Sequence, residues 1–184
     1  MPRLPQPTRE SVKEELRDIF DEVSAGPGGT GTGPMSILKN SPELARRAIP
    51  LFNYLRNESS LPQHVRELAM LTTARAMDCQ YIWNAHAALG REAGLSNNLV
   101  DSIRDKRPLP RLSAEEAAVV NCGTEFFATH RVSENTFDAM MNLFGVQGLV
   151  ELTSLMGYYA MLAFNANTVE RGLPQDTAEP PLPV

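Results

Sequence analysis

The chain has 184 residues, of which 42% are hydrophobic and 21% charged, and its formal net charge is −5. This length suits one domain, and the composition is ordinary for a globular protein. The negative charge, with no basic cluster longer than Arg46-Arg47, argues against nucleic acid and anionic membrane surfaces as partners, because phosphate binding needs a basic face.

Targeting signals are also missing from the sequence. No apolar run approaches the roughly 20 residues that a membrane-spanning helix needs, and residues 1–5 lack the apolar stretch of a signal peptide. Cys79 and Cys122 fit a reducing compartment and do not make a disulfide framework. We therefore expect a cytoplasmic protein with no membrane association.

The first predicted helix spans residues 8–24. Its apolar residues recur at helical spacing: Val12, Leu16, Ile19, Phe20 and Val23. A glycine-rich loop follows at residues 26–34. We interpret it as a loop and not as a phosphate-binding turn, because no strand precedes it and no Gly-Lys-Ser/Thr sequence ends it.

Three further helices are expected before residue 95. Ser41 as N-cap with Pro42 in the first turn predicts a helix to about residue 57. The next is predicted from Leu61-Pro62 to Met77. Its buried side should comprise Val65, Leu68, Ala69, Leu71 and Thr72. We then expect Asp78 to cap a helix that runs from Cys79 to a terminal glycine near residue 94.

Capping signals also divide the second half of the chain. Ser96 begins a short helix to about residue 104, and Ser113 with Glu116 forms a capping box for a helix to about residue 129. Ser133 starts a helix to about residue 144. A long apolar helix at residues 146–169 should be buried or form a subunit interface, and residues 174–184 form a Pro-rich extended arm. The whole chain, 1–184, is thus predicted to be a single all-α domain, a helical bundle of about eight helices.

The helix that begins at Cys79 holds the residues most suited to chemistry. Cys79 and His86 are seven residues apart, nearly two turns, so they share one helical face. A first-turn position would lower the thiol pKa of Cys79 through the helix dipole, and His86 could act as acid or base. Glu67, on the preceding antiparallel helix, could reach them, and Tyr81 adds a proton donor.

Plainer interpretations stand beside this one. A lone cysteine on an apolar face is usually a core residue, and Cys122, with Val119, Val120, Phe126 and Phe127 nearby in sequence, is interpreted as one. His64 and His130 lie near helix ends, where a capping or solvated role is expected. The spacing of His64, Glu67, Cys79 and His86 matches no compact metal motif, so we expect no metal site.

Three segments together resemble the carboxymuconolactone decarboxylase family, which includes alkylhydroperoxidase-type proteins. They are Arg66-Glu67-Leu68, the run Cys79-Gln80-Tyr81-Ile82-Trp83-Asn84-Ala85-His86, and Gly94-Leu95-Ser96. The resemblance covers nearly the whole chain. It implies an all-α fold, a homo-oligomer (usually a trimer or hexamer) with active sites near subunit contacts, a small-molecule substrate and no organic cofactor.

The peroxidase branch of this family resembles Glu, then Cys-x-x-Cys, then His. Glu67, Cys79 and His86 match that pattern, but Ile82 stands at the second cysteine position. Without a second thiol on this helix no local disulfide can form. The alternative left on this branch is peroxiredoxin activity by a one-cysteine, thiol-dependent (alkyl hydro)peroxidase centred on Cys79, with Cys122 as a resolving thiol only if the fold brings it close.

The decarboxylase branch resembles a pattern of Tyr, then Trp, then His, which Tyr81, Trp83 and His86 match, while Asn84 departs from what is expected beside the tryptophan. In this leading hypothesis the chain is a lyase acting on a small carboxylated lactone or related organic acid. His86 is the acid/base, Glu67 relays or orients its proton, Tyr81 and Trp83 wall the pocket, and Arg75 holds the substrate carboxylate. A third alternative is a non-enzymatic oligomeric binding protein whose pocket is closed.

Overall fold

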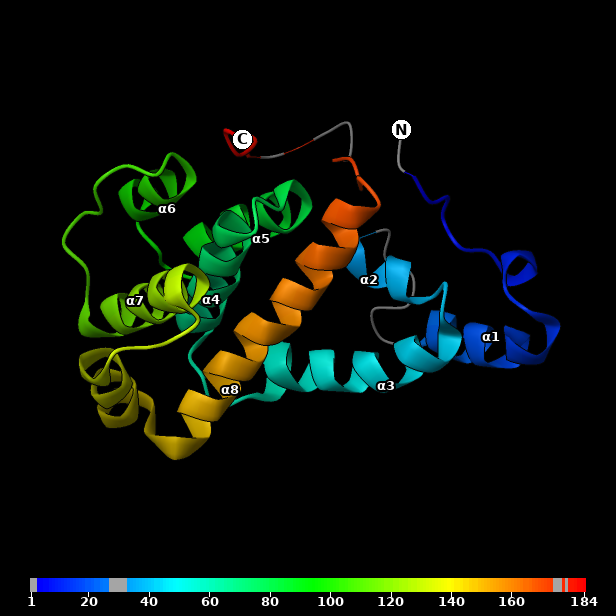
Figure 1. The fold of residues 1–184 in the computed structure, drawn as a ribbon, viewed down its shortest axis with the longest axis horizontal. Helices are drawn as coiled ribbons and strands as arrows, with labels where there is room; N and C mark the ends of the chain where they lie inside the picture. Colours follow the sequence, from blue (N-terminus) through cyan, green and yellow to red (C-terminus); the bar gives the residue numbers. More distant parts are fainter. Residues whose placement is uncertain (1–2, 27–32, 174–176, 178) are drawn as a thin grey trace.

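The computed structural model describes residues 3–26, 33–173, 177 and 179–184. Across these residues it contains eight α-helices and no strand, which confirms the predicted all-α fold. Helix α4 (Gln63–Ala76) is central, and α5 (Gln80–Glu92), α7 (Ala114–Thr129) and α8 (Glu134–Thr168) all pack against it (Figure 1). None of the helices in the described residues combines the length and the hydrophobicity of a membrane-spanning segment.

The central position of α4 follows from its composition. The predicted buried residues Val65, Leu68, Ala69, Leu71 and Thr72 are all buried. Small residues such as Ala74 let neighbouring helices approach on the remaining faces, so nearly the whole helix is covered. Glu67, Thr73 and Arg75 are buried too, which the apolar periodicity did not indicate.

The predicted first helix is wrong at its beginning. Two short 3-10 turns, η1 (Arg9–Ser11) and η2 (Glu14–Leu16), precede α1 (Arg17–Ala25). The Ser11 hydroxyl accepts from the Thr8 amide and donates to the Thr8 carbonyl. Such local side-chain bonds compete with the helical ladder, and here they hold the chain in a turn. Residues 27–32 of the predicted glycine-rich loop lie outside the described residues.

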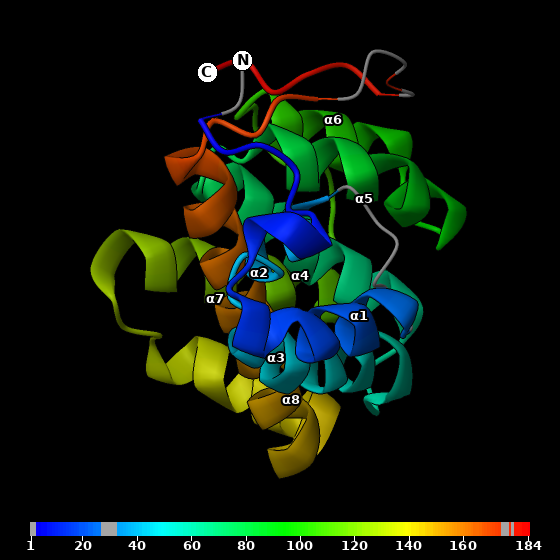
Figure 2. The same ribbon diagram turned by 90° about the vertical axis from the view of Figure 1, so that its right-hand side faces the viewer.

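Helices α2 (Pro34–Leu38) and α3 (Pro42–Asn53) contact each other, and α2 also contacts α8 (Figures 1 and 2). Ser41 is the N-cap residue of α3, as predicted, with Pro42 in the first turn. The helix continues past Asn53 as a π-helical turn, η3 (Tyr54–Glu58). This widened turn changes which way the side chains after residue 53 face.

The α4–α5 turn differs by one residue from the prediction. Cys79 is the N-cap residue and α5 begins at Gln80, while Asp78 has a left-handed backbone conformation with φ of 47°. Asp tolerates this conformation better than most residues, and it reverses the chain within a short turn. Because of this reversal, α4 and α5 pack against each other along their lengths.

The capping signals of the second half are confirmed. Ser96 accepts from the Leu99 amide at the start of α6 (Asn97–Arg104), and both hydrogen bonds of the Ser113–Glu116 capping box are present. The Ser133 hydroxyl accepts from the Thr136 amide. Gly145, with φ of 65°, separates the two predicted helices that make up α8.

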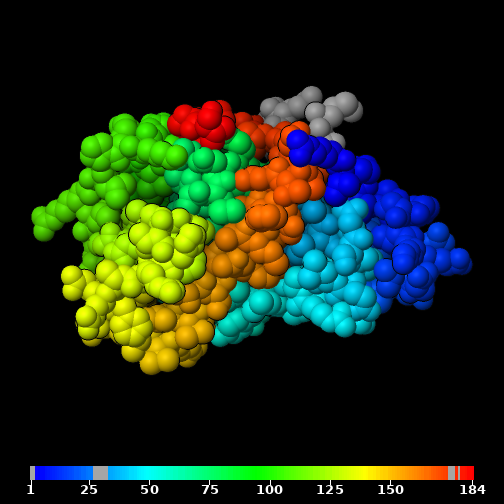
Figure 3. All heavy atoms as spheres, viewed as in Figure 1, coloured from blue at the N-terminus to red at the C-terminus, as the bar shows by residue number. Residues whose placement is uncertain are grey.

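The C-terminal arm lies along α5. Gln80 exchanges two hydrogen bonds with the backbone of Leu182, and Asn84 donates to the carbonyl of Glu179. The Leu182 side chain is buried. Figure 3 shows these last residues (red) on the surface beside α5. Residues 179–184 form no helix or strand, whereas 174–176 and 178 of the predicted arm lie outside the described residues.

Candidate active site

A buried carboxylate–imidazole pair joins α4 to α5. Glu67 Oε2 lies 2.8 Å from Nδ1 of His86, and both side chains are only 6% exposed. The sequence left open whether Glu67 reaches the helix of Cys79 and His86, and the structure shows that it does. Because Glu67 occupies Nδ1, the other ring nitrogen, Nε2, is the one left for a ligand.

Close packing of α4 and α5 makes this pair possible. Gly90 lies one turn after His86, and a Cβ placed there would be 3.0 Å from Leu71 Cδ1 and 3.1 Å from Leu95 Cδ1. The same Cβ would lie 3.8 Å from the Cβ of Glu67. A glycine at this position thus permits the helix–helix distance that the hydrogen bond requires.

His86 also lines a cavity of about 240 Å³, which lies between α5, α8 and residues of α2, α3 and η3. Apart from His86 and Arg56, the walls are apolar or aromatic: Gly33, Pro34, Met35, Phe52, Tyr81, Ile82, Ala85, Tyr159 and Leu162. The Tyr159 ring meets the imidazole edge-on, with 5.2 Å between ring centroids. Burial raises the pKa of Tyr159, so its hydroxyl stays protonated as a neutral wall of the cavity.

Arg56 is a cation of this cavity that the sequence analysis missed. Its guanidinium carbon lies 5.6 Å from the centroid of the Phe52 ring, a cation–π distance. Among the residues that line the cavity, it is the single side chain with a permanent charge. Arg56 lies in the π-helical turn η3, and a regular helical wheel drawn through α3 therefore could not place it beside His86.

Cys79 is placed differently from the prediction. Its side chain is buried and is not among the residues that line the His86 cavity. Burial raises the pKa of the Cys79 thiol, which outweighs the opposing effect of hydrogen bonds from the backbone at Ile82 and Tyr81. The prediction of a lowered pKa from the first-turn position is therefore wrong.

The other predicted site residues are dispersed. Tyr81 lines the His86 cavity, whereas Trp83 is buried in the core and Arg75 lines a separate cavity beside Lys106. Cys122 lies against a third, apolar cavity between α7 and α8, and both cysteines are free. The structure thus brings together Glu67, His86 and Tyr81 and separates them from Trp83 and Arg75.

The remaining histidines lie away from the site. His64 Nε2 is 2.8 Å from Glu115 Oε2 in a partly exposed pair, and His130 ends α7 in a left-handed conformation. Across the residues that the structure describes, no three His, Cys, Asp or Glu side chains are grouped so that they could hold a metal ion.

The part of the chain that holds the buried pair also matches a known protein family. Residues 42–122, which include Glu67 and His86, match the model of the carboxymuconolactone decarboxylase family. No curated protein matches the chain significantly.

Several solved structures share the fold. A peroxidase-related protein from Ralstonia eutropha JMP134, described as an alkylhydroperoxidase AhpD core, is 18% identical with a TM-score of 0.71, covering 95% of this chain and 93% of its own. A peroxidase-related protein from Silicibacter sp. TM1040 is 16% identical (TM-score 0.70, covering 92% and 90%). A cysteine-to-alanine variant of the debrominase Bmp8, in complex with 2,3,4-tribromopyrrole, is 12% identical (TM-score 0.66, covering 94% and 91%).

Proposed function

Because residues 42–122 match the model of the carboxymuconolactone decarboxylase family, we propose that the chain is a decarboxylase-like lyase that acts on a small carboxylated lactone or related organic acid. His86 is its general acid. The observation that carries the proposal is the buried Glu67–His86 pair, whose imidazole lines a cavity that is otherwise mostly apolar.

Glu67 orients the His86 ring. Because its carboxylate is hydrogen-bonded to Nδ1, the proton that the proposed reaction donates is the one on Nε2. Glu67 is not among the residues that line the cavity, so it is a positioning residue. This arrangement holds the proposed acid in a site whose other walls are mostly apolar.

The reaction we propose has two bond changes. The bond between the carboxylate and the ring system breaks, carbon dioxide leaves, and the electron pair moves into the conjugated lactone carbonyl. His86 Nε2–H then donates its proton to carbon, and the imidazole regains a proton from water. Charge that was localised on a carboxylate becomes delocalised, a change that an apolar cavity favours.

Arg56 is the residue that we propose for binding the substrate anion, in place of Arg75. It lies in the His86 cavity, held over the Phe52 ring, whereas Arg75 does not line that cavity. A guanidinium can form two parallel hydrogen bonds to a carboxylate or enolate, and these are stronger in an apolar site than in water. Tyr81 forms part of the wall of the same cavity.

The second candidate is a one-cysteine thiol peroxidase centred on Cys79. The backbone hydrogen bonds from Tyr81 and Ile82 to the thiol favour it, as do the peroxidase-related names of two structural relatives. The burial of the thiol opposes it, because a thiolate is the reacting form. The non-enzymatic alternative predicts a closed pocket, and the cavity beside His86 counts against it.

We also propose a homo-oligomer in the cytoplasm. Exposed apolar side chains from η3, α3 and α8 gather around one surface hollow: Leu51, Tyr54, Val146 and Val150. A contiguous apolar patch of this kind is typical of a subunit interface.

The test is turnover of γ-carboxymuconolactone by the intact protein, followed by carbon dioxide release. We expect His86→Gln to lower kcat by about 100-fold or more, the usual contribution of a general acid. The matched control is His64→Gln, which removes the other histidine that is paired with a carboxylate. Equal activity of His86→Gln and His64→Gln would overturn the role of His86.

A further inference from the structure

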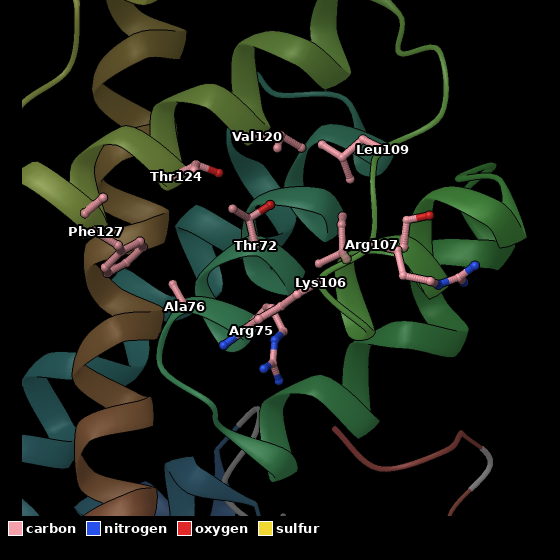
Figure 4. A pocket seen from close by; sticks show the side chains of 12 residues that line it. Thr72, Arg75, Ala76, Lys106, Arg107, Leu109, Val120, Thr124 and Phe127 are labelled. Atoms are coloured by element: carbon pink, nitrogen blue, oxygen red, sulfur yellow. The ribbon is translucent and has the colours of Figure 1, made fainter. Parts of the chain in front are cut away.

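A second cavity is separate from the His86 site. It has a volume of about 450 Å³ and lies among the C-terminal end of α4, the end of α6 with the loop that follows, and α7 (Figure 4). This volume is in the range of small-ligand sites. Its lining includes Arg75, Lys106 and Arg107 together with Thr72 and Thr124.

Arg75 has an unusual hydrogen-bonding state. Its side chain is 8% exposed, and its Nη2 donates to the carbonyl of Pro183 and pairs with Asp78. The other two nitrogens, Nε and Nη1, are buried and have no acceptor among the described residues. Buried guanidinium donors without an acceptor are costly, so the site is suited to a ligand that supplies oxygen atoms.

The charges at this end of the cavity favour an anion. Arg75 Nη2 lies 3.1 Å and Lys106 Nζ 3.8 Å from the same Oδ1 atom of Asp78. Two cations thus share one carboxylate, which leaves one positive charge to be balanced. Arg107 adds a third cation, itself paired with Asp105. Figure 4 shows Lys106 extended toward Arg75.

Helix ends account for part of this arrangement and not for all of it. Arg75 and Lys106 lie at the C-terminal ends of α4 and α6, where cations are stabilised by the helix dipoles. That effect explains the positive charges. It does not explain the two buried donors of Arg75, nor the Thr72 hydroxyl in the same cavity, which also has no partner among the described residues.

The other walls of the cavity are apolar. Ile103 and Val120 are buried, and Leu109 and Phe127 extend the same surface. A ligand that fits both parts has one carboxylate at the Arg75 end and a hydrocarbon body of aliphatic or aromatic carbon against the rest. We propose that this cavity, here named the Arg75 cavity, is a second binding site for a small apolar monocarboxylic acid.

The test uses octanoate as the probe and 1-octanol as its neutral counterpart, with binding to the full chain measured by calorimetry. We expect octanoate to bind at least about 10-fold more tightly than octanol, because the charged head group meets Arg75 and Lys106. Lys106→Gln should weaken octanoate binding about 3-fold to 10-fold. Lys13→Gln, the same change at an exposed lysine outside the cavity, should leave it unchanged.

A second pair of variants tests the place of binding without touching Arg75, whose contacts with Asp78 and Pro183 also support the fold. Thr124→Trp fills the cavity from an exposed position on α7 and should abolish binding. Asn121→Trp, on the same helix but outside the cavity lining, should not. His86→Gln should bind octanoate normally, which separates this site from the proposed active site.

Three results would overturn the inference. They are no octanoate binding by the folded protein, equal affinity for octanol, and binding that survives Thr124→Trp. Loss of binding in His86→Gln would likewise show that octanoate occupies the other cavity.

Discussion

Two histidine–carboxylate pairs in this molecule have the same hydrogen-bond length and different surroundings. His86–Glu67 and His64–Glu115 are both 2.8 Å apart. The side chains of the first pair are 6% exposed, whereas those of the second are 33% and 37% exposed. Only the first pair borders the cavity that also holds Arg56. Burial and an adjoining cavity, more than the pair itself, therefore distinguish a candidate catalytic histidine.

The largest expected difference between the two pairs is in stability. Glu67→Ala leaves a buried imidazole without its partner and should lower the free energy of unfolding by about 3–5 kcal/mol. Glu115→Ala breaks a solvated pair and should cost less than about 1 kcal/mol. Urea unfolding of the two variants measures both. Equal losses would contradict the distinction that we draw between the pairs.

Glu151 is a third carboxylate to set beside Glu67 and Glu115, because it is buried and has no histidine as its partner. Burial alone would raise its pKa, but hydrogen bonds from Gln147, Ser60 and Tyr54 outweigh burial and lower the pKa to about 2. The stabilisation is therefore fully present above its ordinary pKa of 4.5 and is lost as the pH falls toward 2.

Glu151→Gln should remove this pH dependence. In the parent protein, acid unfolding between these pH values includes a loss on the order of 2 kcal/mol from this one group. The variant should be less stable at neutral pH and should have a flatter stability profile in the acid range, as measured by urea unfolding at several pH values. A profile parallel to that of the parent would contradict the lowered pKa.

Gly90 offers a way to disturb the buried pair without changing either partner. A Cβ at position 90 would press on Leu71 and Leu95, whereas a Cβ at Gly157 in α8 would meet nothing within 4 Å. Gly90→Ala should therefore be less stable than Gly157→Ala by about 1–2 kcal/mol, since overpacking offsets the gain in helix propensity.

Activity provides the second readout for this glycine pair. Separation of α4 from α5 should lengthen the Glu67–His86 bond and lower kcat in Gly90→Ala alone. Thermal unfolding and turnover of the two variants together test this. If Gly90→Ala proved as stable and as active as Gly157→Ala, close packing at Gly90 would not be what holds the pair together.

The smallest expected effect concerns Cys79. Burial raises the pKa of this thiol, and burial raises that of Cys122 to about 11. Both should react slowly with iodoacetamide in the folded protein at neutral pH, and much faster in urea. Rapid alkylation of native Cys79, with sulfenic acid formed after peroxide treatment, would favour the peroxidase alternative over acid/base chemistry at His86.

Local signals in the sequence predicted much of the fold. The caps at Ser96, Ser113 and Ser133 and the break at Gly145 depend on residues close together in the chain, and all four are present. The one wrong helix start, at Thr8, also has a local cause. The Ser11 hydroxyl forms hydrogen bonds with the Thr8 backbone that compete with helix formation, and the spacing of apolar residues does not reveal them. The presence of each helix was therefore easier to predict than the residue at which the first helix begins.

The candidate site was predictable only in part. The antiparallel turn between their helices indicated that Glu67 could come near His86, because the contact spans a short stretch of chain, and the structure supplied the hydrogen bond itself. Arg56 reaches the cavity because it lies in a π-helical turn, and Tyr159 reaches it from α8, which is distant in the sequence. No local sequence pattern indicates that these two residues line the cavity. Arg75 was expected at the same site, but the structure places it in the Arg75 cavity.

The most direct test of the central claim is the fate of the proton that replaces carbon dioxide. The reaction is run in D₂O with the intact protein, and the product is examined by NMR. Proton delivery from His86 Nε2 predicts one deuteron at the new C–H position, on a single face of the carbon, and loss of that facial selectivity in His86→Gln. Deuterium distributed equally over both faces by the unaltered protein would mean that water, and not His86, protonates the carbon.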